Sequence, residues 1–390
     1  MKRFLFLFVV SLLTLMEIAA RGSSTAIKID GLFLVLLFFN NCMAYSQEAN
    51  SIVSMLQREP DEEFMAIRCD NNWENSLHFA TILEVDNKYI MYYRANNKEV
   101  PTKWIYCYAE SKDGIRWTKP NLGFYEYAGS TNNNIISDRF NGVSVEYKDS
   151  TFYLLADRIY DAGGEEKRGL YLFESKDGIH FIQSGTPAPM HCDTQNQLMW
   201  DKWTQTYKWY LRSWSFPITP KVESHHRRER YRNVSLFETP SPDVSLLSDY
   251  YLSKTTFGSK ITTLKTEFPV VIQNVKKEDF DIYNPCVHQY REDLYIAYPT
   301  YYYHIPDIAH GGKKDNDGYG RIAMWVSSDG EHFYETKDDY MTNEENWLEF
   351  CIGHVETSEY YIHYYITFDR PHAWSSKNNS IRGRIHYKKQ

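Results

Sequence analysis

Acidic side chains recur at one kind of position in this sequence, directly before or at the start of short segments in which apolar and polar residues alternate. They are Asp70, Glu74, Asp138, Asp193, Asp279, Asp281 and Glu349. Two carboxyl groups that face each other can cleave a glycosidic bond, one as general acid and the other as base or nucleophile. Each acid alone could equally be a strand-end residue that bonds to the backbone. Their recurrence at equivalent places favours a shared site, if the fold brings the segments together.

The elements that would position these acids are predicted by an internal repeat. The run Ser-Lys-Asp-Gly, followed three residues later by an aromatic residue, occurs at 111–117 and 175–181, and a related run occurs at 327–333. Each copy follows an alternating apolar run, and Asp-Gly favours a tight turn between two strands. The closing Trp117 and Phe181 are placed to pack against a neighbouring sheet. A repeated hairpin of this kind indicates the blades of a β-propeller, because one blade buries little alone.

Strand-like runs separated by turns continue from about residue 62 to the C-terminal end and group into five blades. We therefore expect an all-β fold class, a five-bladed β-propeller. The segment 63–69 is then available as the last strand of blade five, which would close the ring and cover both sheet edges. Inner strands of a propeller start around one end of the central funnel, so acids just before them would converge there.

Composition limits the possible partners. The 32 Tyr, 21 Phe and 10 Trp among 390 residues favour β-structure and also suit stacking against sugars. A formal net charge of −8 argues against nucleic-acid binding. The five cysteines after residue 46 are too scattered for a disulfide framework, and His354, His363 and His372 match no metal-binding spacing. We expect a monomer without cofactor or catalytic metal; a structural ion at the propeller axis is the open alternative.

The N-terminal region has the order of an export signal. Lys28 precedes the apolar run Leu32–Phe39, and small residues in Ala44-Tyr-Ser46 follow at the places that a signal peptidase reads. Cys42 is preceded by two asparagines, where a lipidation signal has small residues. We expect residues 1–46 to be the export segment and 47–390 to form a single propeller domain, in the periplasm or outside the cell.

One long run carries a resemblance to known proteins. The sequence Tyr106-Cys-Tyr-Ala-Glu-Ser-Lys-Asp-Gly-Ile-Arg-Trp-Thr-Lys-Pro-Asn-Leu-Gly123, continuing to Asn132-Asn-Asn-Ile-Ile136, resembles exported bacterial glycosyl hydrolase-like proteins. These are grouped with the five-bladed propellers of the arabinanase, invertase and levansucrase superfamily. Trp73-Glu74, Asp193-Thr-Gln-Asn196 and Tyr283-Asn-Pro285 add to the likeness, which covers roughly residues 62–388. It implies a secreted carbohydrate-active enzyme and leaves the sugar open.

The resemblance also suggests roles for residues. Related propellers carry their proton donor at the opening of blade three, so we expect Asp193 to be the general acid. We expect Glu74 to be the base or nucleophile and Glu349 to complete the catalytic ring, with Asp70 and Asp281 binding substrate. The superfamily usually has an aspartate at the opening of blade two, whereas this chain has Asn141, which cannot ionise. Either Asp138 substitutes for it, or Asn141 binds substrate, or catalysis is lost and the protein only binds glycans.

Three functions remain open at this point. The leading hypothesis is a glycoside hydrolase acting on an oligo- or polysaccharide, and the alternatives are a glycan-binding propeller and a glycoside phosphorylase. Phosphorolysis would need basic residues to hold phosphate, and the run 227–232 offers them. Arg228 and Arg230 in this run could also grip a carboxylate or sulfate on an acidic sugar, or they could belong to a solvated loop.

The export signal generates a first prediction. Cleavage after Ser46 would leave Gln47 as the first residue of the mature chain, because the small residues of Ala44-Tyr-Ser46 meet the requirements of a signal peptidase. Intact mass of the exported protein should therefore correspond to residues 47–390. A mature chain that retains Leu32–Phe39 would contradict the prediction.

Overall fold

The computed structural model describes residues 46–97, 99–100, 102–161, 163–189, 192–215, 231–254, 262–264, 270–274, 276, 278, 280–304, 318–344, 346–372 and 379–388. The predicted export segment up to residue 45 lies outside the described residues, and so do Arg228, Arg230 and Asp279. In the part of the chain that is described, no helix is long and apolar enough to cross a membrane.

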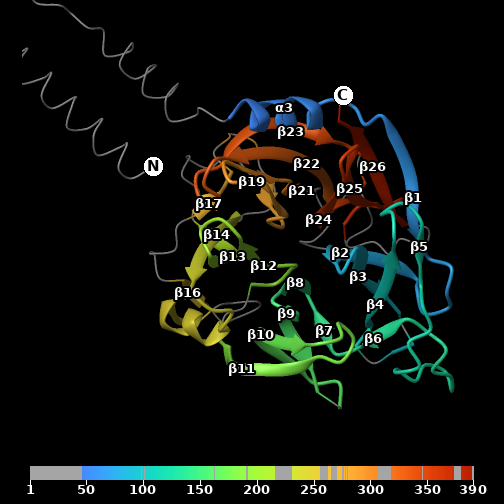
Figure 1. Cartoon of the computed structure of the whole chain (residues 1–390). Coiled ribbons are helices and arrows are strands. Elements are labelled where there is room, and N and C mark those ends of the chain that lie inside the picture. The colour runs from blue at the N-terminus through green and yellow to red at the C-terminus, as the bar shows by residue number, and fades with distance from the viewer. Residues whose placement is uncertain are drawn as a thin grey trace, which may run out of the picture. The chain divides into compact units, whose positions relative to one another are not determined.

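Residues 45–390 form one compact unit, and its strands lie in five groups around a central axis (Figure 1). Blade one consists of β2 (Ser76–Val85), β3 (Lys88–Asn96), β4 (Trp104–Ser111) and β5 (Trp117–Thr118), with β6 (Ile135–Ser137) beside β4. Blade two consists of β7 (Phe140–Asn141), β8 (Ser144–Lys148), β9 (Thr151–Tyr160), β10 (Glu166–Ser175) and β11 (Ile182–Ala188). Blade three consists of β12 (Gln197–Asp201), β13 (Thr206–Ser215), β14 (Tyr231–Thr239) and β17 (Val270–Ile272).

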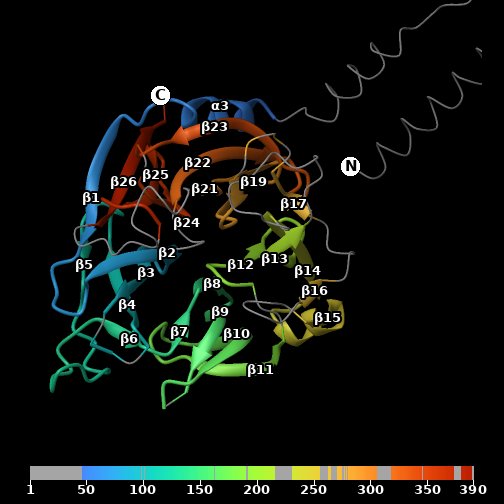
Figure 2. The same ribbon diagram turned by 180° about the vertical axis from the view of Figure 1, so that it is seen from behind.

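Blade four consists of β18 (Phe280–Ile282), β19 (Val287–Arg291), β20 (Leu294–Ala297), β21 (Thr300–His304), β22 (Gly318–Ser327) and β23 (Tyr334–Met341). Blade five consists of β24 (Leu348–Glu356), β25 (Tyr360–Thr367), β26 (Ser380–Tyr387) and the N-terminal β1 (Glu62–Arg68). β1 pairs antiparallel with β26, from Glu62 opposite Ile385 to Arg68 opposite Ser380, as Figure 2 shows from behind. The five-bladed architecture and the closing strand predicted from the sequence are therefore confirmed.

Helix α3 (Gln47–Leu56) was not predicted. Ser46 caps its N-terminus, because the Ser46 hydroxyl accepts a hydrogen bond from the Ala49 N–H at 3.1 Å. Ala49, Ile52 and Leu56 form a buried stripe that packs on the core of blades four and five (Figure 1). β15 (Tyr251–Lys254) and β16 (Thr262–Leu264) lie between η1 (Val244–Tyr250) and β17 in the chain.

The outer strand of blade three, β17, lies in the segment 240–277 and pairs antiparallel with β14. Its sequence signal is short: three consecutive apolar residues, Val270, Val271 and Ile272, carry no alternation that would distinguish a strand from a buried turn.

The three repeated hairpins fasten blades one, two and four to the blade that precedes each of them around the ring. The hydroxyl of Tyr92 in blade one donates to the Gly178 carbonyl of blade two at 2.7 Å. Tyr210 in blade three donates in the same way to Gly330 of blade four at 2.8 Å, and Tyr364 in blade five to Gly114 of blade one. The closing aromatic rings meet the same tyrosines edge-on: Trp117 lies 5.7 Å from Tyr364, Phe181 6.1 Å from Tyr92 and Phe333 6.2 Å from Tyr210. The predicted packing of the hairpin aromatics against a neighbouring sheet is confirmed.

The hairpin contact generates a stability prediction with a matched control. Gly178 and Gly123 both have a left-handed backbone, with φ of +74° and +65°. A Cβ atom at Gly178 would lie 2.5 Å from the Tyr92 hydroxyl oxygen, whereas one at Gly123 would meet nothing within 4 Å. Gly123→Ala should therefore cost about 1 kcal/mol of unfolding free energy from backbone strain alone, and Gly178→Ala about 1–3 kcal/mol more because of overpacking. Equal losses for the two variants in denaturant titrations would contradict this view of the contact.

Candidate functional site

A cavity of about 340 Å³ opens where the inner strands begin, and all five blades contribute to its wall. Its lining residues are Ser76, His78, Phe79, Arg94, Asn96, Trp104, Asn141, Arg158, Asp193, Thr194, Tyr283, Trp347, Glu349, Phe368, Pro371 and His372. The volume lies in the range of small-molecule sites. Among the described lining residues, Asp193 and Glu349 are the acids.

Hydrogen bonds between inner strands form the floor of this cavity. Gln195 donates to the Val143 carbonyl at 2.9 Å, and Gln197 exchanges two hydrogen bonds with the backbone of Val287, at 2.6 and 2.8 Å. A second cavity, of about 220 Å³, is lined by residues further along the same strands, such as Val145, Gln197 and Ile352. The first, upper cavity and the second, lower cavity share no lining residue, and the Gln195–Val143 hydrogen bond joins residues that lie between the two sets along the chain.

A structural ion at the propeller axis, the alternative left open by the sequence, would have to be bound by residues of the lower cavity. His354 lines it, and burial lowers the pKa of His354 to about 4. His363 is buried nearby, with its ring 5.9 Å from that of His354, and burial also holds its pKa well below the usual value. Within the described ranges, no three His, Cys, Asp or Glu side chains are grouped in a way that could hold a metal ion. These histidines are neutral groups of an aromatic cluster between blades four and five.

Glu349 is a buried carboxylate held by three donors. It accepts hydrogen bonds from the Phe79 N–H at 3.0 Å, from Trp347 Nε1 at 3.0 Å and from His78 Nδ1 at 3.1 Å. Burial by itself raises the pKa of Glu349, but His78 and the other donors more than offset this effect and hold the pKa below its usual value. Glu349 is therefore ionised at neutral pH.

His78 is the residue that joins Glu349 to the cavity, and the sequence analysis missed it. Burial lowers the pKa of His78 and outweighs the opposite effect of Glu349, so the imidazole is neutral. Because Nδ1 donates to Glu349, Nε2 is the acceptor, and the Asn96 amide lies 3.2 Å from it. A neutral imidazole oriented by a carboxylate is the arrangement of a general base.

Asp193 lies at the opening of blade three, and its side chain is 29% exposed. It forms ion pairs with Arg158 at 2.6 Å and with Arg212 at 3.1 Å. Arg158 also pairs with the buried Asp157 at 3.1 Å. Burial raises the pKa of Asp157 to about 7, and the negative charge of Asp193 adds to that effect, although Arg158 opposes it. Arg158 therefore joins the two carboxylates, and Asp157 is the one whose pKa burial brings near neutral.

The backbone has an uncommon conformation at Asp193 and at the residue whose N–H binds Glu349. φ is 39° at Asp193 and 128° at Thr194, and Phe79, whose N–H binds Glu349, has φ of 45°. Left-handed conformations at residues other than glycine cost on the order of 1–3 kcal/mol each and concentrate at functional sites. In β2 the register with β3 shifts between His78 and Thr81, so the strand bulges at Phe79, and the preceding His78 lines the cavity.

The predicted site residues fall into two groups. Asp193, Glu349 and Asn141 line the cavity, as their positions before or in the inner strands suggested. Asp70, Glu74 and Asp281 do not line it. The expectation that all five predicted acids meet at one mouth of the funnel is therefore corrected for these three residues.

Glu74 points into the body of blade one. The turn in which the Glu74 N–H bonds to the Asn71 carbonyl at 3.1 Å folds the side chain away from the axis. Its carboxylate accepts hydrogen bonds from Tyr93 at 2.6 Å and from Lys119 at 2.7 Å. Asp70 shares Lys119 and lines a surface pocket of about 640 Å³ on the outer side of blade one.

Asp281 is fully buried in blade four. Its carboxylate accepts from the Arg232 N–H at 3.1 Å, faces His304 Nε2 at 3.0 Å and forms an ion pair with the Arg232 guanidinium. Asp138, the proposed substitute for an acid at blade two, is also absent from the cavity wall, where Asn141 stands.

Three arginines were missed by the sequence analysis although they occupy equivalent places. Arg94, Arg158 and Arg212 lie in the second strand of blades one, two and three, in the last part of β3, β9 and β13. A signal was present, because each follows an apolar run of similar length after a polar turn. Their common position could have been found by aligning the second strands of the blades.

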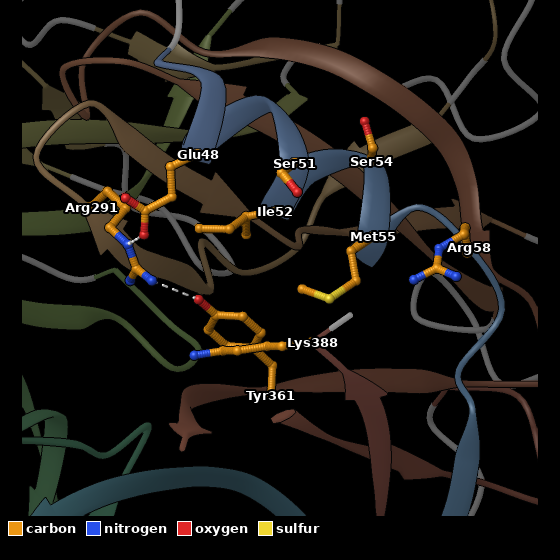
Figure 3. A pocket seen from close by; sticks show the side chains of 9 residues that line it. All are labelled: Glu48, Ser51, Ile52, Ser54, Met55, Arg58, Arg291, Tyr361 and Lys388. Carbon is orange, nitrogen blue, oxygen red and sulfur yellow. Dashed lines mark hydrogen bonds and ion pairs between the residues drawn. The ribbon is translucent and has the colours of Figure 1, made fainter. Parts of the chain in front are cut away.

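A further pocket of about 420 Å³ lies between α3 and blades four and five (Figure 3). Its charged groups satisfy one another: Arg291 binds Glu48, Glu356 at 2.8 Å and the Tyr361 hydroxyl at 2.9 Å. This pocket is a consequence of how the helix docks, and it has neither the acids nor the strained backbone of the axial cavity.

The His78–Glu349 pair generates a prediction on titration. Because the Glu349 charge raises the pKa of His78 and the Arg94 charge lowers it, Glu349→Gln should lower the His78 pKa and Arg94→Met should raise it. Nitrogen-15 spectra should show a neutral His78 with a proton on Nδ1 at pH 7. The exposed His332, whose pKa Asp329 raises, serves as the control and should not respond. If the His78 pKa shifts in the same direction in both variants, the described interaction between His78 and Glu349 is wrong.

Comparison with known proteins shows similarity of fold. Neither the models of protein families nor the curated protein sequences contain a match. Among solved structures, one described as "Glycoside hydrolase" is similar with a TM-score of 0.53 and 12% identity, over 89% of this chain and 96% of that chain. A mannose phosphorylase from Leishmania mexicana, solved with phosphate ion, is similar with a TM-score of 0.50 and 9% identity, over 86% of this chain and 92% of that chain. The chain therefore has the β-propeller fold of glycoside hydrolases and phosphorylases.

Proposed function

We propose that this protein is an exported glycoside hydrolase that cleaves an oligo- or polysaccharide in the axial cavity. The observation that carries the proposal is the pair Asp193 and Glu349: two acids from blades three and five line one cavity but have different environments. Asp193 is partly exposed and shares Arg158 with Asp157, whose pKa burial raises to about 7, whereas Glu349 is buried and ionised. Unequal environments of two acids are what acid–base cleavage of a glycosidic bond requires.

The roles follow from these environments. Asp193 donates a proton to the leaving glycosidic oxygen, and Asp157, which shares Arg158 with it, is the acid whose pKa burial brings near neutral. His78, oriented by Glu349, removes a proton from the attacking water, so Glu349 acts through His78. Glu74, predicted as the base, has no part in this scheme because its carboxylate is bound within blade one.

The wall of the cavity also suits a sugar. Trp104, Trp347 and Phe368 present aromatic faces or edges, and Asn96 and Ser76 offer polar groups between them. Sugar rings stack on aromatic side chains and hydrogen-bond to amides and hydroxyls in the same plane. A cavity that ends at a floor fits the end of a glycan chain better than its middle.

A glycoside phosphorylase is the second candidate. The observation that favours it is the presence of Arg94 and Arg158 in the cavity wall, since guanidinium groups bind phosphate through two parallel hydrogen bonds. The two candidates differ in one requirement, because cleavage by a phosphorylase depends on added phosphate. A glycan-binding protein without activity would cleave nothing under either condition.

The proposed roles predict how activity depends on Asp193 and on pH. On a glycan that the wild-type protein cleaves, Asp193→Asn should lower kcat/KM by roughly a hundredfold or more, because the proton donor is lost. Activity should fall as pH rises through about 7, since Asp157, which shares Arg158 with Asp193, is then deprotonated. Asp157→Asn removes this titrating carboxyl group and should therefore abolish the fall near pH 7.

Asp86→Asn is the matched control for these substitutions. Asp86 is exposed in the turn between β2 and β3, at the far end of both strands from the cavity. This variant should retain wild-type kcat/KM and the wild-type pH profile. Near-normal activity of a folded Asp193→Asn variant would remove Asp193 from the proposed mechanism.

A further inference from the structure

Arg94 differs from the other buried arginines of the funnel. Its side chain lines the cavity and is only 7% exposed, yet no carboxylate lies within ion-pair distance of it among the described residues. Arg158, Arg212 and Arg232 are paired with Asp157, Asp193 and Asp281, respectively. A buried charge without a counter-charge is unfavourable unless something else compensates it.

The guanidinium group of Arg94 packs against two aromatic rings. It lies 4.2 Å from the centroid of the Trp104 ring and 4.5 Å from that of Phe79. These contacts stabilise the cation and define its orientation, but they leave its hydrogen-bonding groups unused. Nη1 donates to the Asn141 side-chain oxygen at 2.7 Å, whereas Nε is buried and has no hydrogen-bond partner within the described ranges.

Asn141 explains why the charge of Arg94 is not neutralised. Its side-chain oxygen accepts from Arg94 and from the Gly142 N–H at 2.9 Å, so the amide nitrogen is left to donate. An aspartate at this place would pair with Arg94 at the same distance and would remove the excess positive charge. The asparagine therefore leaves Arg94 without a carboxylate in direct contact among the described residues, although the ionised Glu349 of the same cavity interacts with its charge, and this side of the cavity presents donors.

We propose that Arg94 and Asn141 form a subsite for an oxyanion, either a carboxylate or sulfate carried by the sugar substrate or a free inorganic phosphate. A guanidinium group that packs against two rings is prepared for two parallel hydrogen bonds to two oxygens of such a group. The subsite rests on the proposed function, since it lies in the same cavity as Asp193 and Glu349. It does not involve Arg228 and Arg230, which lie outside the described residues.

Calorimetric titration of the full propeller with inorganic phosphate, sulfate and glucuronate tests the subsite directly. The wild-type protein should bind at least one of these anions, and Arg94→Met should weaken that binding by at least tenfold. Asn141→Asp should weaken it to a similar degree while conserving the shape of the site, so it tests the charge even if Arg94→Met folds poorly. Arg116→Met, at a 90% exposed side chain of the blade-one hairpin, is the control and should bind as the wild type does.

Two outcomes of the titration would overturn the proposal. One is that none of the three anions binds the wild-type protein. The other is that a bound anion is retained with unchanged affinity in both folded variants, Arg94→Met and Asn141→Asp.

Cleavage assays distinguish the two sources of the oxyanion. If the anion belongs to the substrate, uronic acid-bearing or sulfated oligosaccharides are hydrolysed without phosphate, and Arg94→Met raises KM for them by at least tenfold. If the anion is phosphate, neutral oligosaccharides are cleaved only when it is present. A phosphate oxygen then bonds to the anomeric carbon as the glycosidic carbon–oxygen bond breaks, and the leaving oxygen takes a proton from Asp193, so a sugar 1-phosphate is released.

The same assays separate this inference from the proposed function. Hydrolysis of neutral glycans alone, independent of phosphate and unaffected by Arg94→Met, would overturn the subsite and leave the hydrolase standing. Anion binding that is lost in Arg94→Met, without cleavage of any glycan, would support the subsite and overturn the proposed hydrolase.

Discussion

The hydrogen bond from a tyrosine of one blade to the hairpin glycine of the next is the contact on which the geometry of this propeller depends. Tyr92 and Tyr210 make this bond from the second strands of their blades, to Gly178 and Gly330. Two residues further along the same strands lie Arg94 and Arg212. Because side chains two residues apart lie on one face of a strand, the contact that docks the next blade also sets the register of the arginines at the cavity. The strands that dock neighbouring blades therefore also carry the arginines of the site.

The chemistry of the cavity depends on how charge is compensated there. Asp193 is shared by two arginines, and Arg158 is shared by three carboxylates, including Glu166 at 3.2 Å. Such networks contribute little net stability once desolvation is counted, but they hold charged groups in defined positions. The same cavity contains a neutral histidine that a buried glutamate orients, and an arginine that lacks a carboxylate partner among the described residues. The two halves of the cavity thus differ in charge, which suits a substrate that is itself asymmetric.

A second constraint is the positive φ that recurs along the inner strands. It is found at Phe79, Gly142, Asp193, Cys286 and Gly353, one position in each blade. Only two of the five are glycines, so neighbouring contacts must hold the other three in a conformation that costs energy.

The sequence by itself determined the repeated hairpins, the five blades, the closing strand β1 and three members of the cavity wall: Asn141, Asp193 and Glu349. These are local properties, since a turn signal and an alternating run act over a few residues. Tertiary structure decided the remainder. Glu74 and His78 are four residues apart, and the direction of one turn sends Glu74 into the blade and leaves His78 in the cavity. Whether Arg94 contacts a carboxylate depends on which residues of blades one and two surround it. The apolar stripe of α3 is buried only because blades four and five pack against it. Which side chains face each other across an axis depends on strand register and on contacts far apart in the sequence, and a single chain carries no local signal for either.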